Sequence, residues 1–315
     1  MSSYSKSDVS YNEGILNKGD NFFTPESTIK NSEDTRSQTI HIDSRDRHYD
    51  THPNPNSYVV ELPYAYKDVV SLELICVDIH KSQYNVNSNN NILYVNKDSG
   101  ASNNDLIVKS NYTSLTIPEG EYNITDLMAS LTSSIAAFTT VGSTVSQNAK
   151  TKKLDLATLG TYFRVYLNDS VPTFDGRTKS EPTTNSIANM MGFSSSSRYV
   201  SAASGTLSTT GMANLNGENY ITMKIEDVER TEGSGNVFRG AFARLSVGDK
   251  AHGEVKQLKV SDFGSRCIEV FNPYRGRLNK LRISFYNHDG TLYDFNGVEH
   301  CLSFEIKTLY KNNSY

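Results

Sequence analysis

The segments that alternate apolar and polar residues with a period of two constrain the fold of this chain more than any other feature. Apolar side chains occupy every second position over 281–285 (LRISF) and again over 302–306 (LSFEI). Successive side chains of a β-strand point to opposite faces, so this alternation predicts strands with one buried and one solvent-facing side. The His-Asp-Gly sequence at 288–290 is typical of a tight turn after the first of them.

The N-terminal part of the chain carries the same signal. Residues 40–43 and 58–62 alternate, and the longer run 67–80 (KDVVSLELICVDIH) becomes apolar on both faces toward its end. A strand that is apolar on both faces is typical of the middle of a two-layer core. The residues predicted to share one face of this long strand are Val70, Leu72, Leu74 and Cys76.

Helical spacing interrupts this β pattern in the middle of the chain. Apolar residues from Leu127 to Phe138 recur at intervals of four, four and three, which predicts a helix with Thr125 as its N-cap. "KKLDLATLG" and "YFRVYLN" are predicted to pair as strands, and "SIANMMGF" to form a short helix that ends at Gly192. We therefore predict a small α+β lobe over 98–200.

Together these patterns predict a mainly β chain. Residues 37–97 and 219–315 form an antiparallel β-sandwich, and the α+β lobe is inserted between them. Residues 201–218 are rich in Ser, Thr, Gly and Asn and are predicted to be a linker. Residues 1–36 are polar and are predicted to be a disordered or extended arm, in which Phe22 and Phe23 are a candidate docking point on a partner.

Composition excludes several classes of function. The net charge of -4 implies no general basic surface, so we expect no specific nucleic-acid partner. No apolar run is long enough to span a membrane, and the polar N-terminus does not resemble a signal peptide. The three cysteines have no zinc-binding spacing, so we expect buried free thiols in a reducing compartment.

The charged connector that follows residue 42 is the strongest candidate site. The null hypothesis is that its alternating charges, Asp43, Arg45, Asp46 and Arg47, lock a link between two strands through ion pairs, and the second is that they contact another subunit. A metal site is the third hypothesis, and the two arginines oppose it. Its ligands would be His41, Asp43, Asp46, His48, Asp50 and His52.

Other charged groups give weaker signals. Arg275 and Arg277 in "NPYRGR" are either solvated loop charges or contacts to an acidic partner. Asp289 and Asp294 do not fit a glycosidase pair, because Asp289 is predicted to be a turn residue. We find no nucleophile elbow, Walker loop, HExxH, EF-hand or Rossmann motif. We therefore expect no enzymatic activity, no cofactor and no metal.

Several segments in a fixed order resemble a known class of proteins. They are "IDSRDR", "PNPNSYVVELP", "YKDVVSLELICVDI", "TIPEGEYNITDLMASL", "MMGF" and "LNKLRISFYNHDGTLYDFNGVEHCLSFEIKTLY", and they cover most of 40–310. This combination resembles minor capsid and penton-type proteins of large icosahedral double-stranded DNA viruses, the nucleocytoplasmic large DNA viruses. The resemblance implies a jelly-roll-like sandwich and a structural role in the virion.

These expectations define the predicted function. The chain would be made in the host cytoplasm, would be a non-enzymatic capsid component, minor capsid protein or penton, and would contact the major capsid protein, other capsid subunits or copies of itself. The interface candidates are Phe22, Phe23, Asp43, Arg45, Asp46, Arg47, Arg275 and Arg277. The alternative is a carbohydrate- or receptor-binding β-module of a virion spike or fibre.

Overall fold

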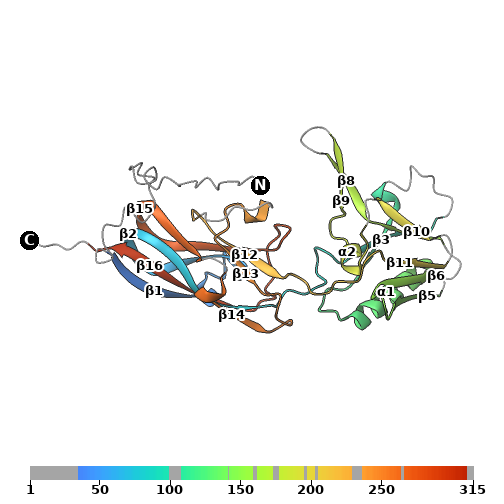
Figure 1. Cartoon of the computed structure of the whole chain (residues 1–315), viewed down its shortest axis with the longest axis horizontal. Helices are drawn as coiled ribbons and strands as arrows, with labels where there is room; N and C mark the ends of the chain where they lie inside the picture. Colours follow the sequence, from blue (N-terminus) through green and yellow to red (C-terminus); the bar gives the residue numbers. More distant parts are fainter. Residues whose placement is uncertain are drawn as a thin grey trace, which may run out of the picture.

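The chain forms two bodies that lie side by side along its longest axis (Figure 1). The computed structural model describes residues 35–98, 108–140, 142–158, 162–172, 177–194, 197–202, 205–228, 236–263 and 266–310. The predictions for the arm, including Phe22 and Phe23, lie outside these residues. The predicted end of the arm at residue 36 is wrong by two positions, because the first strand begins at Thr35 and pairs there with Leu309.

In the ranges given above, the first body is one sheet of seven strands, and every strand pair in it is antiparallel. Six strands follow one another in the order β1-β16-β2-β15-β12-β13, and β14 pairs with β2. Their bounds are β1 Thr35–Asp43, β2 Ser57–His80, β12 Tyr220–Ile225, β13 Ala243–Ser246, β14 Val255–Lys259, β15 Ile268–Tyr286 and β16 Cys301–Leu309.

This sheet folds over on itself to make two layers. The first half of β2 pairs only with β15, whereas its second half also pairs with β16 and β14. Between the halves Asp68 has a φ of 50°, and the ladder to β15 slips between Val270 and Arg275. Such bends let one strand serve both layers of a sandwich. The structure therefore confirms the predicted mainly β, jelly-roll-like antiparallel sandwich with an inserted lobe.

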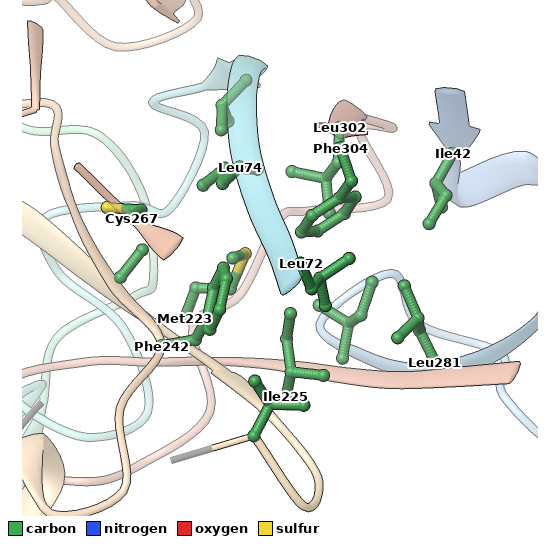
Figure 2. Close-up of a cluster of buried hydrophobic side chains, with 14 of the residues drawn as sticks. Ile42, Leu72, Leu74, Met223, Ile225, Phe242, Cys267, Leu281, Leu302 and Phe304 are labelled. Atoms are coloured by element: carbon green, nitrogen blue, oxygen red, sulfur yellow. The ribbon is translucent and has the colours of Figure 1, made fainter. Parts of the chain in front are cut away.

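The core of the sandwich lies between these two layers. Phe242, which follows the chain from β12 toward β13, lies with its ring centroid 6.2 Å from that of Phe304 on β16. Both side chains are fully buried in one cluster with Leu72, Met223 and Leu302 (Figure 2). Because the cluster draws on strands from both halves of the sheet, burial of apolar area holds the fold closed.

A β-bulge changes which side chains of β2 face this core. Ser303 pairs with Cys76 while its neighbour Phe304 pairs with Leu74, so one residue of β2, Ile75, has no partner in the β16 ladder. Before the bulge Leu72 and Leu74 are fully buried, and beyond it the fully buried side chains are those of Val77 and Ile79. The prediction that Cys76 shares the face of Leu74 is therefore wrong, because the extra residue shifts the alternation by one.

Within its described residues, the second body contains short strands and two α-helices. One sheet has the order β10-β7-β3-β4, another has the order β11-β6-β5, and β8 and β9 form a hairpin. The bounds are β3 Ile92–Asn96, β4 Thr113–Thr116, β5 Ser143–Gln147, β6 Leu154–Thr158, β7 Phe163–Tyr166, β8 Asn168–Pro172, β9 Thr178–Pro182, β10 Tyr199–Ala202, β11 Gly205–Ser208, α1 Ile124–Thr139 and α2 Ala188–Met191. Single 3-10 turns span Ser44–Asp46, Lys109–Asn111, Asn236–Phe238 and Val260–Asp262. None of the helices in the described ranges is long and apolar enough to cross a membrane.

The helix of the lobe begins slightly before its predicted cap. Asn123, not Thr125, is the N-cap, and its side-chain oxygen accepts hydrogen bonds from the backbone of Thr125 and Asp126. An asparagine satisfies the free N–H groups of a first turn as well as a threonine does. The predicted apolar face is confirmed, since Leu127, Leu131 and Ile135 are buried.

The lobe is larger than predicted at both ends. Leu93 and Val95, predicted to belong to the sandwich, and Leu207, predicted to belong to a linker, are buried in the core of the lobe. Leu207 lies in β11, which pairs with β6. The predicted pairing of β6 with β7 is also wrong, because the two strands belong to different sheets. A short strand rich in Ser, Thr and Gly has little apolar pattern of its own, so its partner determines where it lies.

Replacing Gly192 by alanine is expected to destabilise the lobe by more than the roughly 1–3 kcal/mol that a left-handed backbone alone costs a non-glycine residue. Gly192 ends α2 with a φ of +96°, and a Cβ there would collide with the backbone carbonyl oxygen of Gly211. Gly253→Ala is the matched control, since Gly253 also has a positive φ of +82° but has open space around it. Chemical denaturation of both variants checks this, and equal losses of stability would show that the collision is absent.

Candidate functional site

The charged connector continues β1 at the edge of the sheet. Asp43 caps the 3-10 turn Ser44–Asp46, and its carboxylate accepts a 2.9 Å hydrogen bond from the backbone N–H of Arg45. The Arg45 guanidinium returns to the same carboxylate through Nε at 2.9 Å and Nη2 at 2.5 Å. Hydrogen bonding from Arg45 lowers the pKa of Asp43 despite some burial. Because the Arg45 side chain is 70% exposed, this pair is a surface feature.

Arg47 has the opposite environment and is only 5% exposed. Its Nε donates to the carbonyl oxygen of His52 at 2.9 Å, and Nη2 donates to that of Pro53 at 3.0 Å. Its Nη1 donates at 2.6 Å both to the Ser44 carbonyl oxygen and to the Glu299 carboxylate. Since one guanidinium ties both ends of the connector to the segment that precedes β16, Arg47 is a structural lock.

A buried polar chain continues this lock into the core. The Ser44 hydroxyl donates to Glu299 and accepts a 2.9 Å hydrogen bond from the backbone N–H of His300. The His300 ring bonds Tyr58 through Nε2 at 3.0 Å. Burial opposes ionisation of Glu299, but the hydrogen bonds from Arg47 and Ser44 outweigh it and lower its pKa. Burial lowers the pKa of His300 from 6.5 to about 3, so this ring is neutral at neutral pH.

We expect the neutral state of His300 to make the fold acid-sensitive. The unfolded chain takes up a proton at this ring near pH 6.5 and the folded chain only near 3, so the unfolded state binds more protons between these values. Stability from this group is complete above about pH 6.5 and falls as pH decreases, by up to about 1.4 kcal/mol per pH unit. Urea unfolding between about pH 7 and 5 measures this slope, and His300→Gln should reduce it. An unchanged slope in that variant would contradict the assignment.

The metal hypothesis gains no support from the positions of its six candidate ligands. His41 Nδ1 lies 2.8 Å from the Ser303 hydroxyl, and Asp46, His48 and Asp50 are exposed. Across the described ranges, no group of three or more His, Cys, Asp and Glu side chains is placed to hold a metal ion. None of the three cysteines forms a disulfide, and Cys267 is buried while Cys76 and Cys301 are partly exposed, so burial of all three was predicted wrongly.

Arg275 and Arg277 lie on the bend of β15, away from the connector. The prediction of a loop after the Asn-Pro pair is wrong, because both arginines pair with β2 within the sheet. Arg275 lies 3.6 Å from the Asp227 carboxylate, and Arg277 is exposed. Arg275 pairs with Val69 of β2, which pairs with Thr308 of β16, whereas the connector follows Asp43, which pairs with Cys301 at the other end of β16. At about 3.3 Å per residue, these two ends of β16 are about 23 Å apart. The structure therefore does not bring the candidate residues together.

A cleft of about 790 Å³ lies where the lobe meets the sheet, and sequence reasoning missed it. One wall is the asparagine-rich loop 85–91, whose amides hold the loop itself. Asn85 Nδ2 donates to the carbonyl oxygens of Tyr122 at 2.8 Å and Leu215 at 3.0 Å, and Asn90 Nδ2 donates to that of Asn85 at 2.8 Å. The same asparagines that predicted a turn-rich loop thus shape a polar cavity wall.

A second wall of the cleft is acidic. Burial raises the pKa of Glu218, and the nearby charge of Asp289 raises it further. Asp289 is held in its turn by a 2.9 Å hydrogen bond from the backbone of Thr291. His288 lines the same wall, and its Nδ1 lies 2.6 Å from the Tyr220 hydroxyl. Since these residues come from two segments far apart in the sequence, no local spacing could reveal the cleft.

Comparison with known proteins places the chain in a family. The family described as "Family of unknown function (DUF5901)" matches residues 27–158 and 157–314. The chain belongs to DUF5901. A search of curated proteins finds no match to this DUF5901 member. Among solved structures, the crystal structure of the SeMet-labelled mavirus penton protein is similar to it with a TM-score of 0.42 and 9% sequence identity, over 86% of this chain and 99% of that chain.

Proposed function

We propose that this chain is a non-enzymatic structural subunit of a viral capsid, in a minor capsid or penton position, in a large icosahedral double-stranded DNA virus. The observation that carries the proposal is a free sheet edge beside a locked, charged connector. β1 ends the strand order of its sheet, and within the described part of the chain no strand pairs with its outer side. The outer edge of this strand offers backbone N–H and C=O groups to another chain.

The connector adds charge to this edge at a defined position. Arg47 and Glu299 hold its backbone in place, while Arg45 and Asp46 remain exposed to solvent. A charged group on a rigid loop fixes the register of an approaching partner without being ordered on binding. The sequence motifs that resemble minor capsid and penton-type proteins support the same role.

The partners proposed for this surface are the major capsid protein, other capsid subunits or copies of the chain itself. The proposed location is the virion, after synthesis in the host cytoplasm. Arg275 and Arg277 on the β15 bend are proposed as a second contact. Phe22 and Phe23, outside the described residues, stay proposed as anchors of the arm.

A hydrolase is the rival function raised by the cleft. Glu218, whose pKa is raised by burial, is close enough to Asp289 for their charges to interact, and such carboxyl groups are candidates for acid catalysis. Structural carboxyl groups show the same shift. Cleavage of glycosides by the wild-type chain that is lost in Glu218→Gln would replace the non-enzymatic proposal.

Localisation in purified particles tests the capsid role directly. An antibody to the chain should label intact, detergent-washed particles, and a particle reconstruction should contain the seven-stranded sheet at a fixed symmetry position. Absence of the chain from such particles would reject the proposal. Label confined to projecting fibres would favour the spike alternative.

Reversing the charge of the connector should impair assembly without unfolding the chain. We expect Arg45→Glu to lower incorporation into particles about tenfold. A partner surface that complements the Arg45 cation is negative, and the new carboxylate would repel it. Its melting temperature should fall only slightly, since the Arg45–Asp43 pair that it removes lies at the surface and is worth little. Lys150→Glu, an exposed charge reversal on the lobe, is the matched control. Equal incorporation of both variants would remove the connector from the interface.

A further inference from the structure

Two Asn-Gly pairs occur in the sequence, at 216–217 and at 296–297. An asparagine before glycine is prone to lose its side-chain amide spontaneously, because glycine has no Cβ to shield its backbone nitrogen. That nitrogen must reach the Cγ atom of the asparagine, so the local structure decides whether each pair can react. The two pairs have different surroundings.

Asn216 lies where both reacting groups are available. Asn216 and Gly217 are exposed, in the segment between β11 of the lobe and β12 of the sheet. The Asn216 backbone N–H donates to the Asn214 side-chain oxygen at 3.2 Å. Within the described ranges, neither the Asn216 side-chain amide nor the Gly217 backbone N–H forms a hydrogen bond. The side chain can therefore rotate toward the glycine nitrogen.

Asn296 is also exposed, but its side-chain amide is fixed. Its Nδ2 donates to the backbone carbonyl oxygen of Ser82. Its backbone N–H donates to the Asp294 carboxylate at 2.8 Å, and its φ of 49° lies in the left-handed region. Rotation of the amide toward the Gly297 nitrogen would break the bond to Ser82. The same dipeptide is thus held in one place and released in the other.

We propose that Asn216 is a site of spontaneous deamidation, and that the isoaspartate formed there loosens the junction between the lobe and the sheet. The Gly217 nitrogen loses its proton to solvent base and attacks Cγ of Asn216. The bond from Cγ to Nδ2 then breaks, and ammonia leaves. Water opens the resulting succinimide at one of its two carbonyl carbons, and the products are aspartate or isoaspartate. The proposal does not depend on a place in the capsid, because water is the only other reactant.

The position of Asn216 gives this reaction a structural consequence. Isoaspartate carries the main chain through its side-chain carbon and so adds a methylene to the backbone. The preceding residue, Leu215, accepts a 3.0 Å hydrogen bond from Asn85 Nδ2. The following residue, Gly217, lies against Asn85, since a Cβ on it would be 3.6 Å from Asn85 Cβ. A longer backbone between these two contacts cannot keep both, so the junction should loosen. Either product also adds negative charge beside Glu218 in the acidic wall of the cleft.

Peptide mapping of the full chain by mass spectrometry measures the reaction. In the folded chain at mildly alkaline pH, we expect Asn216 to deamidate at least about tenfold faster than Asn296, because only Asn296 must first break a hydrogen bond. Methylation by an isoaspartyl methyltransferase identifies the isoaspartate. In urea the two rates should become similar, since the dipeptide is the same and the folded contacts are gone. An intact Asn216, equal rates in the folded chain, or the same ratio in urea would overturn the proposal.

Asn216→Gln separates deamidation from other effects of ageing. Glutamine keeps the amide but must close a larger ring, so it reacts far more slowly. We expect backbone hydrogen exchange of 83–87 and 213–219 to be at least about twofold faster in aged than in fresh wild type. Aged and fresh Asn216→Gln should match. Asn216→Asp, which adds the charge without the methylene, should exchange like fresh wild type. Unchanged exchange in deamidated wild type, or fast exchange in Asn216→Asp, would contradict the loosening by isoaspartate.

Discussion

Arg47→Met is expected to lower the free energy of unfolding by about 3–5 kcal/mol, the range observed when one partner of a buried ion pair is removed. The loss has two parts. Glu299 keeps its charge without its cation, and the carbonyl oxygens of Ser44, His52 and Pro53 lose their donor. Urea unfolding followed by tyrosine fluorescence measures it.

Arg45→Met is the matched control, because it removes the same charge two residues away. Its side chain is 70% exposed and pairs only locally with Asp43, so we expect no measurable loss of stability. Similar losses in the two variants would mean that Arg47 is not the lock of the connector. A loss in Arg47→Met that is reversed by the second change Glu299→Leu would identify the stranded carboxylate as its main cause.

Phe304→Ala is expected to lower the free energy of unfolding by about 3–5 kcal/mol, as other buried phenylalanines do when they are truncated. Phe304 is fully buried between the two layers of the sheet. Truncation removes apolar contacts on both sides of the core and leaves a cavity that rigid strands close poorly. Tyr64→Ala is the control, since Tyr64 is 72% exposed and should contribute little.

The pair formed by Phe242 and Phe304 also tests whether the two layers meet. With ring centroids 6.2 Å apart, the two side chains should couple by about 0.5–1.5 kcal/mol in a double-mutant cycle. Additive losses would mean that the layers do not touch at this point.

The strands of the sandwich could be predicted because a strand that is buried on one face carries an apolar residue at every second position. Leu281, Ile283 and Phe285 are all buried as this pattern indicates. The bulge at Ile75 could not be predicted, since both faces of this part of β2 are apolar and an apolar residue fits either of them. Pairing between distant segments, such as β11 with β6, also depends on tertiary contacts and not on local spacing.

The candidate site divides in the same way. Alternating charges predicted ion pairs within the connector, but the buried cation is Arg47 and its charged partner is Glu299, outside the connector. The acceptor for Arg47, Glu299, lies 252 residues away and carries no signal of its own. The cleft depends on Thr183, Glu218 and Asn287, which only the placement of the lobe brings together.

The crossing points between the two bodies give the lobe the character of an exchangeable module. Asn85, just after the chain leaves β2, donates a 3.0 Å hydrogen bond to the carbonyl oxygen of Leu215, shortly before the chain returns in β12. The chain therefore leaves the sheet body and returns to it at neighbouring positions, as it would for a short loop. Because closing a longer loop adds only about 0.6 kcal/mol per doubling of length, one sheet can tolerate inserted lobes of very different size. Related chains could thus carry different lobes on the same supporting sheet.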